Sequence, residues 1–402
     1  MKHLTRCWQF LACLASFFLV SSVSAATYTV NPAIPLSPTS FHSLSGLLQS
    51  VTLAPGDEVV LCSGCVFTDT VMIKGQGTPE QPIWIHTSGF SKAIFDADGQ
   101  NLDSIGSMIR FPATSAYIKF DNIEVKNVNG NNRGVFVNGD TITFVNCLID
   151  HNGNGIVSGN EARYLLIDHC EVAYNGNGGL GHNIHTQGLK TTIQHSYIHD
   201  AQGGVNVKDR SRHYGGEFFA TELLYNYISS ARAGGYEIDL SGRGTWETQS
   251  VRMLGNVIEA EITGNQRFMI SYGNNQRGGE LFAAYNTFKP SSSTQALIRS
   301  FDSRETTLVS NVWTGGKRLL IGSGYIYGWL NMLPVGTLQY SLANTVTDAS
   351  QFTCAPWIAA IAYPEFEPPV VATSLLFDPV KRVDVGFAPG AFGGVAGCQR
   401  TW

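Results

Sequence analysis

Short apolar segments recur between residues 119 and 314, and each has a small polar residue near its centre. They read KFDNIEV, TFVNCLI, LIDHCEV, TIQHSYI, LLYNYIS, MLGNVIE, AAYNTFK and LVSNVWT. Their spacing of 23 to 30 residues is typical of stacked repeats, and its variation excludes a leucine-rich or ankyrin module. We align the small residues as one buried ladder: Asn122, Cys147, Cys170, Ser196, Asn226, Asn256, Asn286 and Asn311.

A second apolar strand follows these segments after about a dozen residues, with the sequences HNIHT, VNVKD, YEIDL, FMISY and ALIRS. Two strands per repeat, joined by Gly- and Asn-rich turns such as HNGNGI, predict an all-β fold. We expect a right-handed parallel β-helix of about 8–10 coils, with successive coils about 4.8 Å apart. The inward centres of the second strands are Ile184, Val207, Ile238, Ile270 and Ile298.

The ends of such a solenoid need protection, because a terminal coil exposes apolar area and unpaired backbone groups. Residues 26–60 are expected to hold an N-terminal strand and a capping helix, residues 61–345 the coils, and residues 346–402 an irregular C-terminal cap. The helix is predicted over Phe41–Val51, where Leu44, Leu47, Leu48 and Val51 share one face. No Pro- or Ser-rich linker divides residues 26–402, so we expect one domain and a monomer.

The first 25 residues have the pattern of a signal peptide. Lys2 and Arg6 precede the apolar run Phe10–Val20, and Val23-Ser24-Ala25 fits a cleavage site. The apolar run is shorter than the ~20 residues that span a bilayer. We therefore expect export to the periplasm or the medium, with no membrane span in the mature chain.

Six cysteines remain after removal of the signal, an even number that favours disulfides in an exported chain. Cys354–Cys398 is the preferred bridge. Cys62 and Cys65 are interpreted as a structural staple or packed thiols, because no thioredoxin-like βαβ pattern surrounds them. Cys147 and Cys170 share a ladder position within disulfide range, and we expect packed thiols there.

Charged residues make up only 14% of the chain, and the net charge of −5 excludes a basic surface for nucleic acid. Aromatic residues reach 11%, which argues against disorder. Against this background, strand alternation predicts a row of outward polar side chains on the second strands. The positions after the central residues are His185, Lys208, Asp239, Ser271 and Arg299, and those before them are Asn183, Asn206, Glu237, Met269 and Leu297.

Such a row can be plain solvated surface, but its composition suits a binding site. The oxygens of Asn206, Glu237 and Asp239 suit Ca²⁺, which takes six to eight oxygen ligands. Lys208, Arg210 and Arg212 suit an acidic sugar. An enzyme that removes a proton α to a uronate carboxylate needs both kinds of group.

PGDEVVL, followed by GTPEQPIWIHTSG and the coils, resembles the opening of exported β-helix proteins that include pectate-lyase-like and chondroitinase/alginate-lyase-like polysaccharide lyases. The segment GHNIH…HSYIHDAQGGVNVKDRSR…GGYEIDLSG also resembles bacterial right-handed β-helix repeat proteins. The resemblance covers roughly residues 50–345. It implies cleavage of an anionic polysaccharide by β-elimination.

The lyase resemblance implies Asn206 and the pair Glu237 and Asp239 as calcium ligands. The lysine that follows the acidic pair in those lyases is absent, and Ser241-Gly242-Arg243 stands there. Lys208 or an arginine would then be the base. The expected site comprises Lys208, Arg210, Arg212 and His185 in catalysis, Asn183, Arg243, Tyr272 and Arg299 at the substrate, and Asn206, Glu237 and Asp239 at Ca²⁺.

Other functions remain open at this stage. Glu237 and Asp239 lie roughly 6.6 Å apart along a strand and could serve an inverting glycoside hydrolase, although the NTD and DD motifs of polygalacturonases are absent. A non-catalytic carbohydrate-binding or surface-structural β-helix is the other alternative. His182/His185 and His195/His199 have zinc-ligand spacing for a helix, but on strands each pair favours stacking or turn hydrogen bonds. His195, Tyr225 and Tyr285 predict an external stacking ladder.

Overall fold

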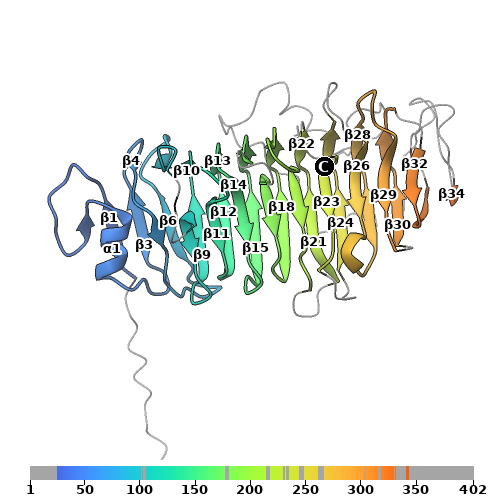
Figure 1. Cartoon of the computed structure of the whole chain (residues 1–402). Coiled ribbons are helices and arrows are strands. Elements are labelled where there is room, and N and C mark those ends of the chain that lie inside the picture. Colours follow the sequence, from blue (N-terminus) through green and yellow to red (C-terminus); the bar gives the residue numbers. More distant parts are fainter. Residues whose placement is uncertain are drawn as a thin grey trace, which may run out of the picture.

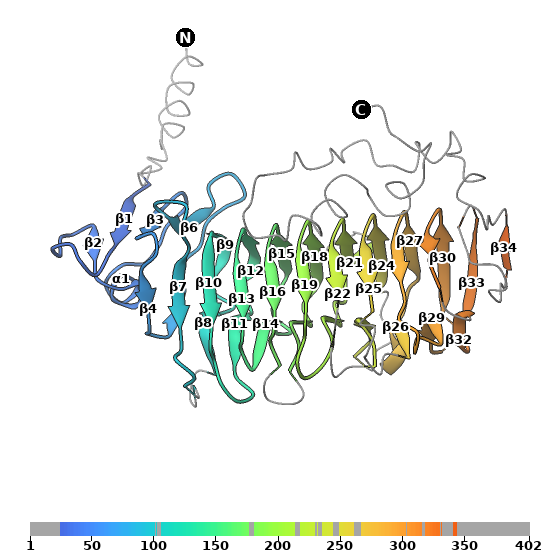
Figure 2. The same cartoon turned by 90° about the horizontal axis from the view of Figure 1, so that it is seen from above.

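The computed structural model describes residues 25–343 apart from internal gaps at 101, 103–105, 177–180, 214–217, 230, 232–234, 244–248, 261–266, 303, 316–317, 330 and 332–340. The predicted signal peptide, the predicted C-terminal cap and the predicted Cys354–Cys398 bridge lie outside the described residues. Across the described part, parallel strands stack side by side into one elongated solenoid (Figures 1 and 2). No helix in this part is long and apolar enough to cross a membrane.

Three parallel sheets form the walls of the solenoid, and each coil visits them in the order sheet 1, sheet 2, sheet 3. The 14 described strands of sheet 1 are, in spatial order, β2 (Ser40–Phe41), β1 (Thr27–Val30), β3 (Glu58–Leu61), β6 (Ile83–Thr87), β9 (Ala116–Asp121), β12 (Asp140–Val145), β15 (Tyr164–Asp168), β18 (Lys190–Gln194), β21 (Phe219–Leu224), β24 (Ser250–Leu254), β27 (Leu281–Ala284), β30 (Glu305–Val309), β33 (Tyr325–Trp329) and β34 (Ser341–Ala343).

Sheets 2 and 3 each contain ten described strands. Sheet 2 comprises β4 (Val66–Phe67), β7 (Ala93–Asp96), β10 (Ile123–Lys126), β13 (Leu148–Asp150), β16 (Glu171–Ala173), β19 (Tyr197–His199), β22 (Tyr227–Ser229), β25 (Val257–Glu259), β28 (Thr287–Lys289) and β31 (Val312–Trp313). Sheet 3 comprises β5 (Val71–Met72), β8 (Ser107–Phe111), β11 (Arg133–Val137), β14 (Asn154–Ser158), β17 (Ile184–Thr186), β20 (Val207–Asp209), β23 (Ile238–Leu240), β26 (Phe268–Tyr272), β29 (Ala296–Ser300) and β32 (Arg318–Gly322).

These sheets confirm the parallel β-solenoid, with one correction to its repeat. Each apolar segment that the sequence suggested as one strand contains two, because a single residue turns the chain from sheet 1 into sheet 2. That residue has a left-handed φ between +48° and +64° in successive coils, a conformation that asparagine tolerates better than most residues. The bend column contains Asn122, Asn146, His169, His195, Tyr225, Gly255, Tyr285 and Ser310.

The residue after each bend points inward and forms the predicted ladder. Asn226 Nδ2 donates to Asn256 Oδ1 at 3.0 Å, and Asn256 Nδ2 donates to Asn286 Oδ1 at 2.8 Å. Asn311 and Asn331 continue the series. The prediction that these asparagines lie in adjacent coils is confirmed. The place given to Asn122 is wrong by one residue, because strand register aligns Ile123 with Cys147 and puts Asn122 in the bend.

The cysteines agree with the expected structural roles. Cys62 and Cys65 form a disulfide with a Cα–Cα distance of 5.6 Å. This pair is therefore the structural staple and not a pair of packed thiols. Cys147 and Cys170 are free and fully buried, so the expectation of packed thiols is confirmed. The Cys147 backbone N–H donates to Cys170 Sγ at 3.3 Å.

The helix α1 (Leu44–Ser50) lies at the end of the solenoid that holds β1 and β3 (Figure 1). Ser43 caps it, because its hydroxyl accepts the Gly46 N–H at 3.1 Å. Leu44 and Leu47 are fully buried and join the core of the solenoid. The predicted helix therefore exists, while its role as a cap and the right-handedness of the coils stay predictions.

Candidate functional site

A row of charged side chains crosses the outer face of sheet 3. Strands β17, β20 and β23 are only three residues long, and each points its middle residue outward: His185, Lys208 and Asp239. Strand register places His185 beside Lys208 and Lys208 beside Asp239. Strand register continues this line through Ser271 and Arg299, which confirms the predicted alignment of five coils, but Ser271 is buried rather than exposed as predicted.

Lys208 lies at the centre of this row and is half-buried. Its Nζ is 3.8 Å from Asp239 Oδ2. Burial lowers the pKa of Lys208 and Arg210 lowers it further, while Asp239 opposes both. The environment thus favours the free amine of Lys208 more than water does.

Two histidines beside Lys208 are neutral imidazoles at neutral pH. Burial, with Lys208 and Arg210, lowers the pKa of His182 to about 4. Burial, His182 and the same two cations lower the pKa of His185 to about 3. The rings lie 5.4 Å apart, and His182 Nδ1 accepts the Val205 N–H at 3.0 Å. The two rings meet edge to face, and His182 also makes the kind of turn hydrogen bond that the strand geometry predicted.

An open cavity of about 790 Å³ adjoins the row where the chain leaves sheet 3. Arg210 and Arg243 line it, and polar side chains supply most of the remaining wall: Gln187, Asn274, Asn275, Gln276 and Asp302. Arg210 Nε donates to Ser241 Oγ at 3.3 Å, which holds this guanidinium at the edge of the cavity. Two cations in a polar hollow suit an anionic, hydroxyl-rich ligand.

A buried ion pair supports the cavity from below. Arg277 Nη1 lies 3.0 Å from Asp209 Oδ2, and both side chains are fully buried. The same guanidinium donates to the Asp209, Ser241 and Gln249 carbonyls, and so ties three turns together. Gly242 is packed so closely that an added Cβ would lie 2.4 Å from Arg277 N. Sequence reasoning missed this pair because alternation does not reveal a charge that points inward.

Two other predicted site residues, Arg212 and Arg299, do not line the cavity. Arg212 Nη2 donates to the Asn160 carbonyl at 2.9 Å, outside the residues that line the cavity. Arg299 Nη1 contacts Tyr236 Oη at 3.0 Å, and its guanidinium lies over the rings of Phe268 and Phe301. Arg299 thus stays on the outer face, three coils beyond Lys208.

The expected outward positions before each strand are wrong. Asn183, Asn206 and Glu237 are fully buried, and Tyr272 is buried in the core. Alternation fails there because the first three precede strands β17, β20 and β23 and lie in the bend that enters sheet 3. Met269 and Leu297 follow them in the same column and are also buried. Those two apolar residues were the sequence signal that this column faces the interior.

The proposed calcium ligands do not fit a calcium site. Asn206 Nδ2 donates to Glu237 Oε2 at 2.7 Å, and Asn206 Oδ1 accepts from Asn183 Nδ2 at 2.7 Å. The oxygens of both residues are therefore used inside the solenoid, while Asp239 points outward beside Lys208. Ca²⁺ needs six to eight oxygens converging on one point. The same burial removes Glu237 from any hydrolytic pair with Asp239.

Two arginines that sequence reasoning missed extend the row toward earlier coils. Arg110 lies beside Phe136 on sheet 3, and Arg133 flanks the same ring, with guanidinium-to-centroid distances of 5.5 and 4.8 Å. Burial and Arg110 lower the pKa of Arg133. Arg110 could have been found by extending the outward column backward from His185 through β14, β11 and β8, whereas Arg133 begins β11 outside that column.

Solved structures of similar fold include two polysaccharide lyases. Pectate lyase Pel9A is 16% identical, with a TM-score of 0.58 over 80% of this chain and 83% of that one. An alginate lyase from a Paenibacillus species is 14% identical, with a TM-score of 0.58 over 80% of this chain and 99% of that one. These likenesses confirm the fold expected from the resemblance. No protein-family model and no curated protein matches the sequence.

Proposed function

We propose that this chain is an exported protein that binds an anionic, uronate-containing polysaccharide across sheet 3 and cleaves it by β-elimination. The observation that carries the proposal is Lys208, a half-buried amine of lowered pKa that lies beside the neutral His185 and two residues before Arg210, which lines the cavity together with Arg243. The similar fold of pectate and alginate lyases supports the same chemistry at the level of fold alone.

The chemistry assigns a role to each group. Arg210 and Arg243 bind the uronate carboxylate and stabilise the charge that develops when its α-carbon loses a proton. The free amine of Lys208 takes that proton. The electron pair of the broken C–H bond forms the C4–C5 double bond, and the C4–O glycosidic bond breaks. The leaving oxygen then receives the proton from the Lys208 ammonium, so that the base is regenerated.

This mechanism needs no resident metal ion, because arginines supply the positive charge. His185 lies beside Lys208 and is neutral, so it adds no positive charge that would compete with Arg210 and Arg243 for the substrate carboxylate. Asp239 positions the Lys208 side chain through their ion pair.

The test is incubation of the mature protein with alginate, pectate and chondroitin, with and without a chelator. Cleavage is measured by the far-ultraviolet absorbance of the unsaturated product. We expect cleavage of one of these polymers, and Lys208→Ala should lower kcat by about 10²–10⁴-fold. Lys119→Ala on sheet 1 is the matched control and should retain full activity.

Full activity of Lys208→Ala would show that the mechanism is wrong. If a uronate polymer binds and Arg210→Ala weakens that binding, but no polymer is cleaved, the protein is a carbohydrate-binding module. Export is tested separately, by N-terminal sequencing of the mature protein for a start near Ala26. The Cys62–Cys65 disulfide supports an oxidising destination.

A further inference from the structure

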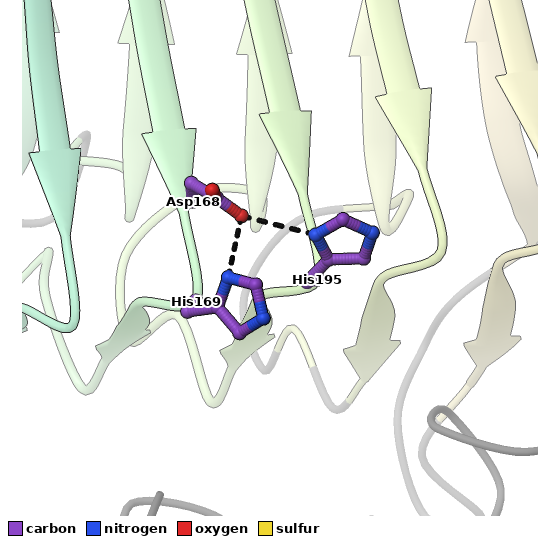
Figure 3. Close-up of side chains that lie close together, drawn as sticks. All are labelled: Asp168, His169 and His195. Atoms are coloured by element: carbon purple, nitrogen blue, oxygen red, sulfur yellow. Dashed lines mark hydrogen bonds and ion pairs between the residues drawn. The ribbon is translucent and has the colours of Figure 1, made fainter. Parts of the chain in front are cut away.

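A second group of chemically active side chains lies where sheets 1 and 2 meet, at the one corner of the solenoid that sheet 3 does not border. Asp168 is the last residue of β15, and His169 is the bend residue that follows it. His195 is the bend residue of the next coil, directly after β18. Figure 3 shows the two imidazoles converging on the carboxylate from adjacent coils.

The three side chains are close and share one acceptor. Asp168 Oδ1 lies 2.7 Å from His169 Nδ1 and 3.0 Å from His195 Nδ1. The two rings are 4.8 Å apart, and each residue has a ligand atom within 4.8 Å of the other two. Exposed fractions of the side chains are only 20%, 22% and 12% for Asp168, His169 and His195. Partial burial and the fixed backbone bends therefore limit the conformations of the three side chains even without a bound ligand.

We propose that Asp168, His169 and His195 bind a divalent transition-metal ion of the zinc type. Two imidazole nitrogens and one carboxylate oxygen are ligands that Zn²⁺ prefers, at about 2.0–2.2 Å from the metal. Ligand atoms in a tetrahedral site are then about 3.4 Å apart, so each of the two hydrogen-bonded pairs must open by roughly half an ångström. A water molecule or a small anion completes the coordination.

The proton positions follow from this arrangement. The Nδ1 atoms that now face Asp168 become the metal ligands, so each neutral ring carries its proton on Nε2 in the metal-bound state. An aspartate carboxyl is ordinarily ionised at neutral pH, so Asp168 offers a charged oxygen ligand.

The bend column supplies conservative substitutions for testing the site. Asn122 and Asn146 adopt the same left-handed conformation in two earlier coils, with φ of +57° and +54°. His169→Asn and His195→Asn therefore keep a residue that suits this backbone while removing an imidazole. His151→Asn is the matched control, because His151 has the same left-handed φ of +54° and an exposed side chain and does not belong to the cluster.

The experiment is titration of chelator-treated, untagged protein with ZnCl₂ by calorimetry, repeated with Co²⁺, whose visible absorption reports tetrahedral coordination. We expect one ion bound by the cluster, and at least about 100-fold weaker binding in His195→Asn and in Asp168→Asn. His151→Asn should bind like wild type, and circular dichroism should show the same fold for every variant.

Absence of saturable binding in the wild type, or equal affinity in His195→Asn, would mean that the group is only a hydrogen-bonded carboxylate and would overturn the proposal. Because the readout is binding at a corner remote from the sheet 3 row, it does not depend on whether any polysaccharide is cleaved.

Discussion

At the scale of single residues, the site depends on charges whose surroundings differ sharply within one coil. Lys208 and Asp209 are neighbours in sequence, yet Lys208 faces outward while Asp209 is fully buried against Arg277. Thr186, Ser211 and Thr221 also donate to the Asp209 carboxylate. A buried carboxylate with this many partners fixes the strand from which Lys208 projects.

Arg277→Met should destabilise the protein by about 3–5 kcal/mol, because it leaves the Asp209 charge buried without its partner. Chemical denaturation of the variant measures the loss. Arg318→Met removes an exposed arginine from β32 and should change the free energy of unfolding by less than about 0.5 kcal/mol. Equal stability of the two variants would show that the buried pair has no structural role.

His182 and His185 should make stability fall as the pH is lowered. Their folded pKa values, about 4 and about 3, lie below the unfolded value of about 6.5. The unfolded chain therefore binds more protons between about pH 6.5 and pH 3, and the stability that is complete above pH 6.5 declines across this window.

The slope is up to about 1.4 kcal/mol per pH unit for each histidine. His182→Gln and His185→Gln should each flatten it, as measured by denaturation midpoints from pH 7 to pH 4. A slope that survives the double variant His182→Gln/His185→Gln would refute the assignment.

At the scale of the elements, short strands and one-residue bends explain what could be predicted. The recurrence of apolar pairs around a polar residue was sufficient for the parallel stack and for the asparagine ladder. The bend residue itself was not recognised, because His169, His195 and Tyr225 carry no glycine-like signature of a left-handed φ. The strands of sheet 2 were therefore not recognised, because each lies in the same apolar segment as a strand of sheet 1.

The same bends decided how much of the site was predicted. Alternation placed His185, Lys208 and Asp239 correctly because each lies inside a strand. It failed for Asn206 and Glu237, which lie one residue before a strand begins. Period-two reasoning holds only while the backbone stays extended, and strands of three residues leave little room for it.

Asn256→Ala tests how much the asparagine ladder contributes to the free energy of unfolding. The Asn256 amide donates to Asn286 Oδ1 and to the Leu223 carbonyl, and its oxygen accepts two bonds from Asn226. Its removal leaves several buried groups unsatisfied and should cost about 3–5 kcal/mol, measured by chemical denaturation. Asn131→Ala, at an exposed asparagine, is the control and should cost little. A loss below 1 kcal/mol for Asn256→Ala would contradict the structural role of the ladder.

At the scale of the whole molecule, each coil contacts mainly its two neighbours, so the terminal coils lack one source of stabilisation. The helix α1 lies at one end and buries Leu44 and Leu47 in the core. The two proposed sites lie on different faces of this stack, one across sheet 3 and one where sheets 1 and 2 meet.

Leu47→Ala should destabilise the coils next to α1 by about 2–5 kcal/mol, because it leaves a cavity in a fully buried position. Hydrogen exchange should then quicken in β1 and β3 more than in β24 or β27. Leu36→Ala removes a side chain that is 64% exposed and should have little effect. Uniform acceleration along the chain would instead indicate that the solenoid unfolds as one cooperative unit.

The asparagine ladder has a direction. From Asn226 to Asn311, each side-chain amide donates to the asparagine oxygen of the coil that follows, and from Asn256 to Asn331 each of these oxygens accepts from the coil that precedes. The coils are synthesised in this same order, so each new coil supplies the oxygen that accepts a hydrogen bond from the asparagine of the coil before it. Successive asparagines from Asn226 to Asn286 are 30 residues apart, so duplicating or deleting one such unit in the gene would rejoin equivalent donors and acceptors at the junction. The ladder therefore gives this protein a route to change its length, and with it the length of its outer faces, one coil at a time.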